Sequence, residues 1–460
     1  MLKAWWALAF FCLVFALPLR AFDWETATSN GREYVTLHSF CLFYGFGYQA
    51  PSGNPRFVSR NALHSVIFKL GASDIYIDGV HYLLSFPIEE GDHDWLVSRM
   101  DVIKLFEPIL RPTEIADLHP IRGVVIDAGH GGSDNGAGSR LGNEKTYTLD
   151  TAYRLDALLR GAGLKTVFTR RTDVFVDLYE RAHIASLYPD YCFVSIHFNS
   201  AMEEARGLET YCLSPRGAAS TSSPYLTRGD IQKLPGNDYD TVNILLASMV
   251  HSEIIKLNPG DATADRGVKR ARFVVIKQNV LPAILVEGGF VSNHMEAARV
   301  NRSDYRQSLA QAIARGVIRF VNVMGDRHLQ LPDEGADAPA PRATPVVPTA
   351  PSGLAHDPAN GKVKASSTTT TVTTTSSSTS ASHKVKKKKT TATPEPPTAS
   401  SPGPNTPSGA LNLSEPATPA PSAGAEKASA EPDEPPTVNS PSGGSGSATN
   451  ANASPTSPNP

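Results

Sequence analysis

The chain has 460 residues and a formal net charge of −2 at pH 7, so it lacks the strong positive charge of a general nucleic-acid-binding protein. After Phe320 it contains no Phe, Trp, Tyr or Cys, and from about Pro332 onward Pro, Ser, Thr, Ala and Gly predominate. Such a segment buries too little apolar surface to offset the entropy lost on ordering. We therefore predict a disordered tail over residues 332–460. The dense basic run within it, Lys384–Lys389, is either a solvated patch or a contact for an anionic cell surface.

The first 21 residues have the pattern of an export signal. Lys3 precedes an apolar run of about a dozen residues, too short for an ordinary membrane span, and Leu19-Arg20-Ala21 ends the segment. We predict a signal peptide over residues 1–21, cleaved near Ala21, with an uncleaved anchor as the alternative. The mature chain would then be exported to the periplasm or cell wall and would contain no stable transmembrane span.

Three cysteines follow the predicted signal, namely Cys41, Cys192 and Cys212. An odd number cannot form a complete disulfide framework, so the folded part is expected to depend on its apolar core.

Residues 22–112 contain two similar halves, offset by 62 positions. In each half a short strand pattern, Tyr34–Leu37 or Leu96–Arg99, precedes apolar residues at helical spacing. Between them, Asp78-Gly79 lies between alternating apolar residues, which predicts a β-hairpin. This part resembles the small α+β module at the N-terminus of copper amine oxidases. We interpret it as a binding or spacer domain without an evident metal cluster.

From Ile121 the pattern changes to alternating strands and helices, which predicts an α/β fold with functional groups at strand ends. The predicted strands are Val124–Ile126, Thr166–Thr169, Cys192–His197, Leu208–Leu213, Phe273–Ile276 and Ile284–Val286. The predicted helices are one beginning near Glu144 and others near Leu178–Leu187, Val242–Leu257 and Tyr305–Val323.

Four ionisable residues lie at the edges of these elements. His130 follows a predicted strand, Glu144 opens a helix, His197 ends an apolar run, and Glu287 ends the run PAILVE before two glycines. Two imidazoles and one carboxylate are the protein ligands of many catalytic zinc ions, and a further carboxylate can act as general base. The competing hypothesis is an anion nest in GHGGSDNGAG, but the segment lacks the lysine and hydroxyl residue of a Walker loop.

Seven motifs occur in the order found in one enzyme family. They are DAGHGGSDNGAG, Asn143-Glu144-Lys145, TRRTDVFVDLYERAHIA, SIHFNS, GLETYCL, RGVKRARFVVIK and PAILVEGGFVSN. Over residues 121–322 the chain thus resembles the zinc-dependent N-acetylmuramoyl-L-alanine amidases of the amidase-3 family. The resemblance implies a catalytic domain over residues 121–325, with a mostly parallel sheet flanked by helices. It also implies that His130, Glu144 and His197 bind Zn²⁺ and that Glu287 is the catalytic acid/base, with Glu209 as its rival.

The sequence departs from the family pattern at three places. Ala128 stands where proline is commoner. Phe198 replaces a commoner alanine, and the polar stretch Ser214–Tyr239 resembles an insertion near the substrate groove. Such inserts block the site in some relatives until a partner binds, so an activator protein is expected. The implied function is hydrolysis of the amide bond between N-acetylmuramic acid and L-alanine in peptidoglycan, for wall remodelling or daughter-cell separation. The alternative is a noncatalytic peptidoglycan-binding protein.

Overall fold

The computed structural model describes residues 22–51, 53–115, 119–223, 225–261, 264–325 and 327–331, which belong to one compact unit. The predicted signal peptide and the predicted tail over residues 332–460 lie outside the described residues. Among the helices that the structure describes, none is both long and apolar enough to cross a membrane.

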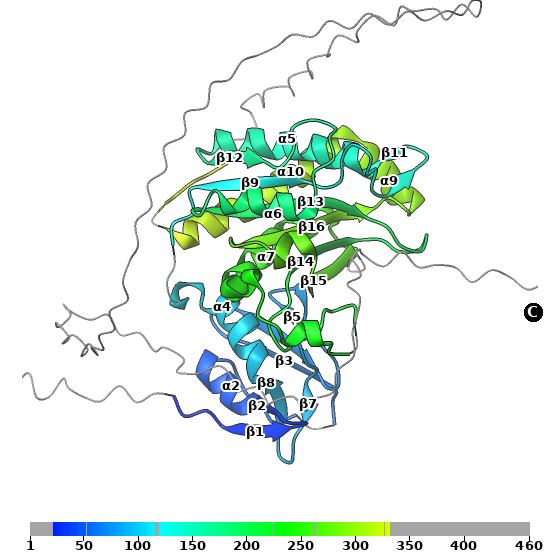
Figure 1. The fold of residues 1–460 in the computed structure, drawn as a ribbon. Coiled ribbons are helices and arrows are strands. Elements are labelled where there is room, and N and C mark those ends of the chain that lie inside the picture. The colour runs from blue at the N-terminus through cyan, green and yellow to red at the C-terminus, as the bar shows by residue number, and fades with distance from the viewer. Residues whose placement is uncertain are drawn as a thin grey trace, which may run out of the picture. The chain divides into compact units, whose positions relative to one another are not determined.

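The N-terminal part forms two antiparallel sheet regions and a helical layer (Figure 1). Its strands are β1 (Thr26–Ser29), β2 (Arg32–Thr36), β3 (Arg56–Arg60), β4 (Ser65–Lys69), β5 (Asp74–Ile77), β6 (Val80–Leu83), β7 (Glu89–Glu90) and β8 (Trp95–Ser98). Its helices are α2 (Leu37–Tyr44), α3 (Arg99–Asp101), η1 (Val102–Phe106), α4 (Glu107–Leu110) and η2 (Pro112–Glu114). The order β1-β2-β8-β7 and the predicted strand–helix steps β2–α2 and β8–α3 make this part α+β.

Local sequence explains these elements. The side chain of Thr36 accepts a hydrogen bond from the backbone N–H of Ser39 and caps α2, while Gly45 ends that helix in the left-handed conformation. Asp78 and Gly79 both have positive φ, 53° and 81°, as a two-residue hairpin turn between β5 and β6 requires. The hairpin predicted from Asp78-Gly79 is thus confirmed.

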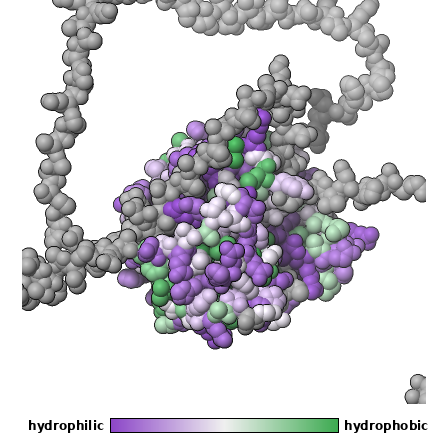
Figure 2. All heavy atoms as spheres, turned by 90° about the horizontal axis from the view of Figure 1, so that it is seen from below, coloured by the Kyte–Doolittle hydropathy of each residue, from purple (hydrophilic) through white to green (hydrophobic). Residues whose placement is uncertain are grey.

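The outer surface of the N-terminal part is mainly polar. Figure 2 views the molecule from this side, and among its coloured residues hydrophilic side chains alternate with small apolar areas. Most large apolar side chains of this part, including Phe40, Phe68 and Phe106, are instead buried, whereas Leu42 and Leu63 are exposed. Most of its apolar residues therefore serve the core.

The second part has the strands β9 (Gly123–Ala128), β10 (Gly138–Ser139), β11 (Gly142–Asn143), β12 (Lys165–Phe168), β13 (Tyr191–Asn199), β14 (Leu208–Leu213), β15 (Asp265–Ala271) and β16 (Ala283–Phe290). Its helices are α5 (Glu144–Gly161), α6 (Leu178–Ser186), η3 (Arg228–Ile231), η4 (Pro235–Tyr239), α7 (Asp240–Ile254), η5 (Ile255–Leu257), α8 (Val274–Lys277), α9 (His294–Asn301) and α10 (Ser303–Met324). The short strands β10 and β11 and the helix α9 were not predicted from the sequence.

Apart from β10 and β11, which pair only with each other, these strands form a mostly parallel sheet, as predicted. Strands β12, β9, β13 and β16 are parallel neighbours, β14 runs antiparallel to β16, and β15 runs parallel to β14. Helices α5, α7 and α10 pack on one face of the sheet, and the smaller core beneath α6 and α8 covers part of the other (Figure 1). The result is the layered α/β architecture expected from the alternating pattern.

The sheet continues into the N-terminal part. Strand β15 pairs in parallel with β6, and β6 pairs with the hairpin strands to give the ten-stranded order β12-β9-β13-β16-β14-β15-β6-β5-β4-β3. Residues far apart in the sequence therefore share one sheet, although the segment 22–112 was predicted as a separate module.

Two expectations need correction. Residues Phe273–Ile276 were predicted as a strand because they are aromatic and β-branched, but Val274–Lys277 form the single-turn helix α8. Strand β15 ends at Ala271 and β16 begins only at Ala283, so the chain must turn between them. The one-turn helix places Val275 and Ile276 in the core beneath the sheet, and this tertiary packing outweighs local β-propensity.

The stretch Ser214–Tyr239 is not next to the predicted catalytic groups. It follows β14, which is antiparallel to β16, so it begins at the sheet edge opposite to Glu287. Arg272 forms an ion pair with Asp230 within this stretch, and the Asn237 side chain donates to the carbonyl of Ser214 at 3.0 Å. The expectation of an insert near the substrate groove was wrong because strand direction, which the sequence does not show, decides the edge at which a loop lies.

Candidate metal centre

The sheet brings the predicted site residues to one edge. Because β9, β13 and β16 are parallel, their carboxyl ends lie at the same edge, and His197 on β13 is the register partner of Glu287 on β16. Alternation along the strands places both side chains on the face of Phe193 and Leu285, which belong to the core beneath α6 and α8. The centre therefore lies on that face, at the carboxyl edge.

His130 follows β9 in an uncommon backbone conformation, with φ of 61°. Two buried arginines hold this turn: Arg181 donates to the carbonyl oxygen of His130 at 2.8 Å, and Arg170 donates to that of Gly129 at 2.8 Å. Arg181 also pairs with the buried carboxylate of Asp127 at 2.7 Å. The strained position of His130 is thus fixed by hydrogen bonds that the sequence reasoning did not anticipate.

Three ligand atoms, from His130, Glu144 and His197, lie within 4.8 Å of one another. His130 Nε2 is 3.1 Å from Glu144 Oε2, and His197 Nδ1 is 3.0 Å from Glu144 Oε1. The residues come from a loop, a helix N-terminus and a strand, so only the folded chain brings them together. Among the described residues this is the group of His, Cys, Asp and Glu side chains that could hold a metal ion.

Glu144 is held as a carboxylate at the first position of α5. The backbone N–H groups of Ala137 and Phe198 donate to its two oxygens at 2.8 and 2.9 Å. Burial alone would raise the pKa of Glu144, but the hydrogen bonds of His130 and His197 outweigh burial and lower it to about 2. An anionic oxygen thus faces each imidazole.

His130 has an additional partner that fixes its ring. Its Nδ1 atom is 2.8 Å from Asp134 Oδ2, and its Nε2 atom faces the other ligands. A carboxylate on the second nitrogen is the usual way in which proteins orient a metal-binding histidine. Asp134 was missed by the sequence reasoning, although its position four residues after His130 in the glycine-rich loop was a signal.

Two glycines make room for the ligands. A side chain at Gly129 would collide with the ring of His197, and one at Gly136 would collide with His130 and Glu144. The glycines therefore provide the close approach expected of this loop.

Glu287 is buried beside this cluster. Its Oε2 atom has no hydrogen-bond partner in the structure. Burial raises the pKa of Glu287 well above its ordinary value, and the negative charges of Glu144 and Glu209 raise it further, while Lys269 opposes them. A buried carboxyl group with a free oxygen and a raised pKa suits a group that gives and takes a proton.

Glu209, the rival for that role, differs sharply. It is the register partner of Glu287 on β14. Burial would raise its pKa, but the charge and hydrogen bond of Lys269 and further hydrogen bonds lower it. Its oxygens accept hydrogen bonds from Asn199, Tyr211, Arg266 and Lys269. A carboxylate with this many donors is a poor general base, so the geometry favours Glu287.

The donor set fits a catalytic zinc ion. Two imidazole nitrogens and one carboxylate oxygen converge, the His130 ring is oriented by Asp134, and an unpartnered carboxyl oxygen of Glu287 lies nearby. Three protein ligands leave one coordination position for water or substrate. The anion-nest hypothesis fits less well, because the carboxylate of Glu144 lies against the loop and accepts from Ala137.

The comparisons with known proteins agree with this geometry. Residues 124–319 match the family described as N-acetylmuramoyl-L-alanine amidase. The chain is 33% identical over 219 residues to N-acetylmuramoyl-L-alanine amidase AmiA of Escherichia coli, which covers 43% of this chain and 76% of that protein. The chain belongs to the N-acetylmuramoyl-L-alanine amidase family.

Further relatives agree with the assignment to this amidase family. The sporulation-specific N-acetylmuramoyl-L-alanine amidase of Bacillus subtilis is 32% identical over 202 residues, covering 44% of this chain and 68% of that protein. The solved structure of the amidase AmiC2 of Nostoc punctiforme has 32% identity and a TM-score of 0.36, covering 43% of this chain and 96% of that one. The family match and the sequence relatives support peptidoglycan amidase activity.

Proposed function

We propose that this chain is a zinc-dependent hydrolase that cleaves the amide bond between N-acetylmuramic acid and L-alanine. His130, Glu144 and His197 would hold the ion, and Glu287 would be the general acid and base. The observation that carries the proposal is the convergence of the three ligand atoms within 4.8 Å of one another.

Each residue has a distinct task. A zinc ion at this position would supply a Lewis acid that polarises the amide carbonyl and lowers the pKa of water. Glu144 would neutralise part of the positive charge of the ion, and hydrogen bonds from two backbone N–H groups keep its carboxylate in place. Asp134 holds the His130 ring so that its Nε2 atom faces the site.

Glu287 transfers the proton. In its carboxylate form it takes a proton from the attacking water, whose oxygen forms a bond to the amide carbon. It then donates that proton to the leaving nitrogen of L-alanine as the C–N bond breaks, which yields a carboxylic acid and an amine. Burial beside Glu144 disfavours the charged form of Glu287, so its carboxylate takes a proton from water readily.

The cellular setting is also part of the proposal. The signal pattern over residues 1–21 supports export to the periplasm or cell wall, where the enzyme would act in wall remodelling or daughter-cell separation. An activator protein stays a prediction from the resemblance. The position of Ser214–Tyr239 at the opposite sheet edge gives that stretch no direct means of covering Glu287.

The test uses the whole mature chain. The protein is expected to contain about one zinc per chain and to release stem peptides from sacculi, because its donor set suits catalytic zinc. His130→Ala and His197→Ala are each expected to lose the metal and the activity, measured by elemental analysis and by mass spectrometry of the products. His183→Ala is the matched control, since His183 is an exposed histidine on α6.

Full zinc occupancy in both ligand variants would contradict the assignment of the site. A parent protein that binds sacculi and contains zinc but releases no stem peptide would instead favour the noncatalytic peptidoglycan-binding protein.

A further inference from the structure

Arg266 lies at the same sheet edge as Glu287, and only part of its guanidinium group is hydrogen-bonded within the described residues. It is the second residue of β15, beside Glu209 on β14. Its Nε atom donates to Glu209, but among the described residues no acceptor is recorded for its two terminal nitrogens. The side chain is 35% exposed, so part of it is accessible to a ligand.

Three neighbours hold this guanidinium group in place. Glu209 binds its Nε atom, and the ring of Phe290 lies beneath it, 4.9 Å from the guanidinium carbon to the ring centroid. Gly207 leaves room for the aliphatic part, because a side chain there would meet Cγ and Cδ of Arg266. A guanidinium group that is already held in place loses little conformational freedom when it binds a ligand. Arg266 is therefore better suited to bind a ligand than a mobile surface arginine would be.

The charges around it are not balanced. Glu209 is shared by Arg266 and Lys269, which leaves one excess positive charge in the group of three. The planar fork of an arginine matches both oxygens of a carboxylate. The group therefore suits an anionic ligand that brings its own carboxylate.

The distance from the reacting centre indicates which part of the substrate would reach it. Glu287 is on β16, Glu209 on the neighbouring strand β14 and Arg266 on the next strand, β15. Two strand spacings of about 4.8 Å place Arg266 roughly 10 Å from Glu287. An extended peptide advances about 3.3–3.6 Å per residue, so this corresponds to the second or third residue after the cleaved bond.

We propose that Arg266 determines specificity by binding a free carboxylate on the second or third residue of the peptide leaving group. This inference rests on the proposed amidase function and adds the recognition of an acidic peptide. The peptide would lie across β16, β14 and β15, with its amino end at Glu287 and its carboxylate at the guanidinium group.

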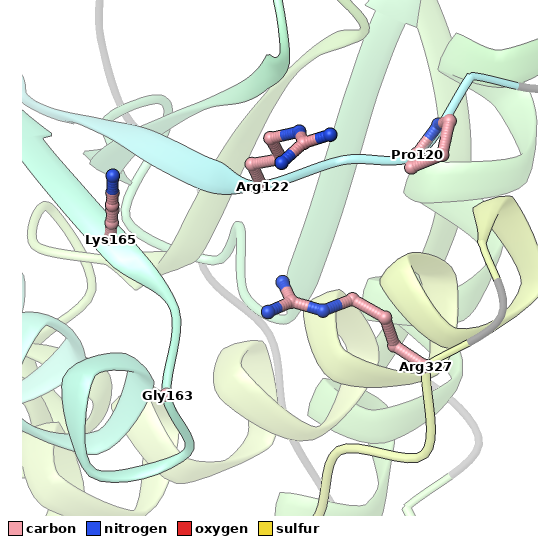
Figure 3. Close-up of a pocket in the computed structure, with 5 residues that line it drawn as sticks. All are labelled: Pro120, Arg122, Gly163, Lys165 and Arg327. Atoms are coloured by element: carbon pink, nitrogen blue, oxygen red, sulfur yellow. The ribbon is translucent and has the colours of Figure 1, made fainter.

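Another basic group lies at the opposite edge and offers a matched control. Arg122, Lys165 and Arg327 line a pocket there, and Figure 3 shows their side chains around it. Arg122 directly precedes β9 and Lys165 begins β12, so both lie at the amino ends of parallel strands. A substitution at Arg122 changes the net charge as one at Arg266 does, but far from Glu287.

The experiment compares synthetic muramoyl peptides whose second and third residues carry either a carboxylate or the matching carboxamide. The parent is expected to prefer the carboxylate by about 10- to 100-fold in kcat/KM, the usual range for a hydrogen bond to a charged group. Arg266→Gln should remove that preference by slowing only the carboxylate substrate. Arg266→Lys should keep part of it, and Arg122→Gln should keep all of it.

The ratio between the two substrates separates recognition from damage to the fold. A variant of Arg266 that slows both substrates equally, or a parent that cleaves both equally, overturns the inference and leaves the amidase function intact. A zinc-loaded parent that cleaves neither substrate nor sacculi overturns the proposed function itself.

Discussion

Two arginines on the same strand, Arg266 and Arg270, have different environments at opposite sheet edges. Arg266 is 35% exposed and shares one carboxylate with Lys269. The Arg270 side chain is only 2% exposed: it pairs with Asp101 at 3.5 Å and donates to the carbonyl of Lys104 at 3.2 Å. The comparison shows that an arginine remains available for a ligand where the chain does not provide an acceptor for each of its donors. It becomes structural where the chain surrounds it with acceptors.

The buried arginine also joins the two parts of the compact unit. Asp101 and Lys104 both belong to the N-terminal part, and Lys104 itself pairs with Asp240 at 3.6 Å. Near the other end of β15, the backbone N–H of His81 donates to Asp265 at 3.0 Å. With the pairing of β6 and β15, these contacts make the N-terminal part a continuation of the catalytic sheet.

The largest effect is expected from removing the N-terminal part. A fragment of residues 115–331 would expose the edge of β15 and lose Asp101, the ion-pair partner of Arg270. We expect this fragment to aggregate or to lack a cooperative unfolding transition, in contrast to residues 22–331, as measured by circular dichroism and size-exclusion chromatography. A fragment that unfolds cooperatively with the stability of the longer protein would show that residues 22–112 are an independent module, as the sequence predicted.

The next effect concerns Glu287 and the sheet edge at which it lies. Glu287→Gln keeps the size of the side chain but removes its basic oxygen, so release of stem peptides should fall by about 10²- to 10⁴-fold. Zinc content and binding to sacculi should be unchanged, because Glu287 is not a proposed ligand. Glu180→Gln on the exposed face of α6 is the control. A Glu287 variant with parental activity would move the base elsewhere, with Glu209 as the next candidate.

At the opposite edge the expected effect is on stability. Arg270→Met should lower the free energy of unfolding by about 3–5 kcal/mol, because it leaves the buried carboxylate of Asp101 unpaired. A second substitution, Asp101→Leu, should restore much of that loss. Denaturant unfolding of the two single variants and the double variant gives the coupling between them. If Arg270→Met is as stable as the parent, the buried pair does not hold the two parts together.

The smallest effect is a pH dependence of stability that arises from Glu287. Burial raises the folded-state pKa of Glu287, so the metal-free folded protein keeps a proton that the unfolded chain releases as pH rises above about 4.5. Glu287 therefore costs stability above that pH and nothing well below it. Glu287→Gln should have the same Tm as the metal-free parent near pH 4 and a higher Tm at pH 7. A difference in Tm that does not grow with pH would contradict the raised pKa.

Much of the candidate site was predictable because it depends on local chemistry. A glycine-rich loop after an apolar strand places His130 at a strand end, and apolar runs ending in His197 and Glu287 indicate buried strands with polar ends. The choice between Glu287 and Glu209 was not local. It depends on the four side chains that surround Glu209, two of which come from the distant strand β15.

By itself, the sequence determined the α/β alternation, the hairpin at Asp78-Gly79 and the residue types of the candidate metal centre, because periodicity and turn chemistry act over a few residues. Only the tertiary structure decided the direction of β14, and with it the position of Ser214–Tyr239 away from Glu287. It likewise decided the pairing of β6 with β15 and the different environments of Arg266 and Arg270. Strand order, strand direction and burial arise from contacts between distant segments, and the local pattern of one segment does not specify its partner.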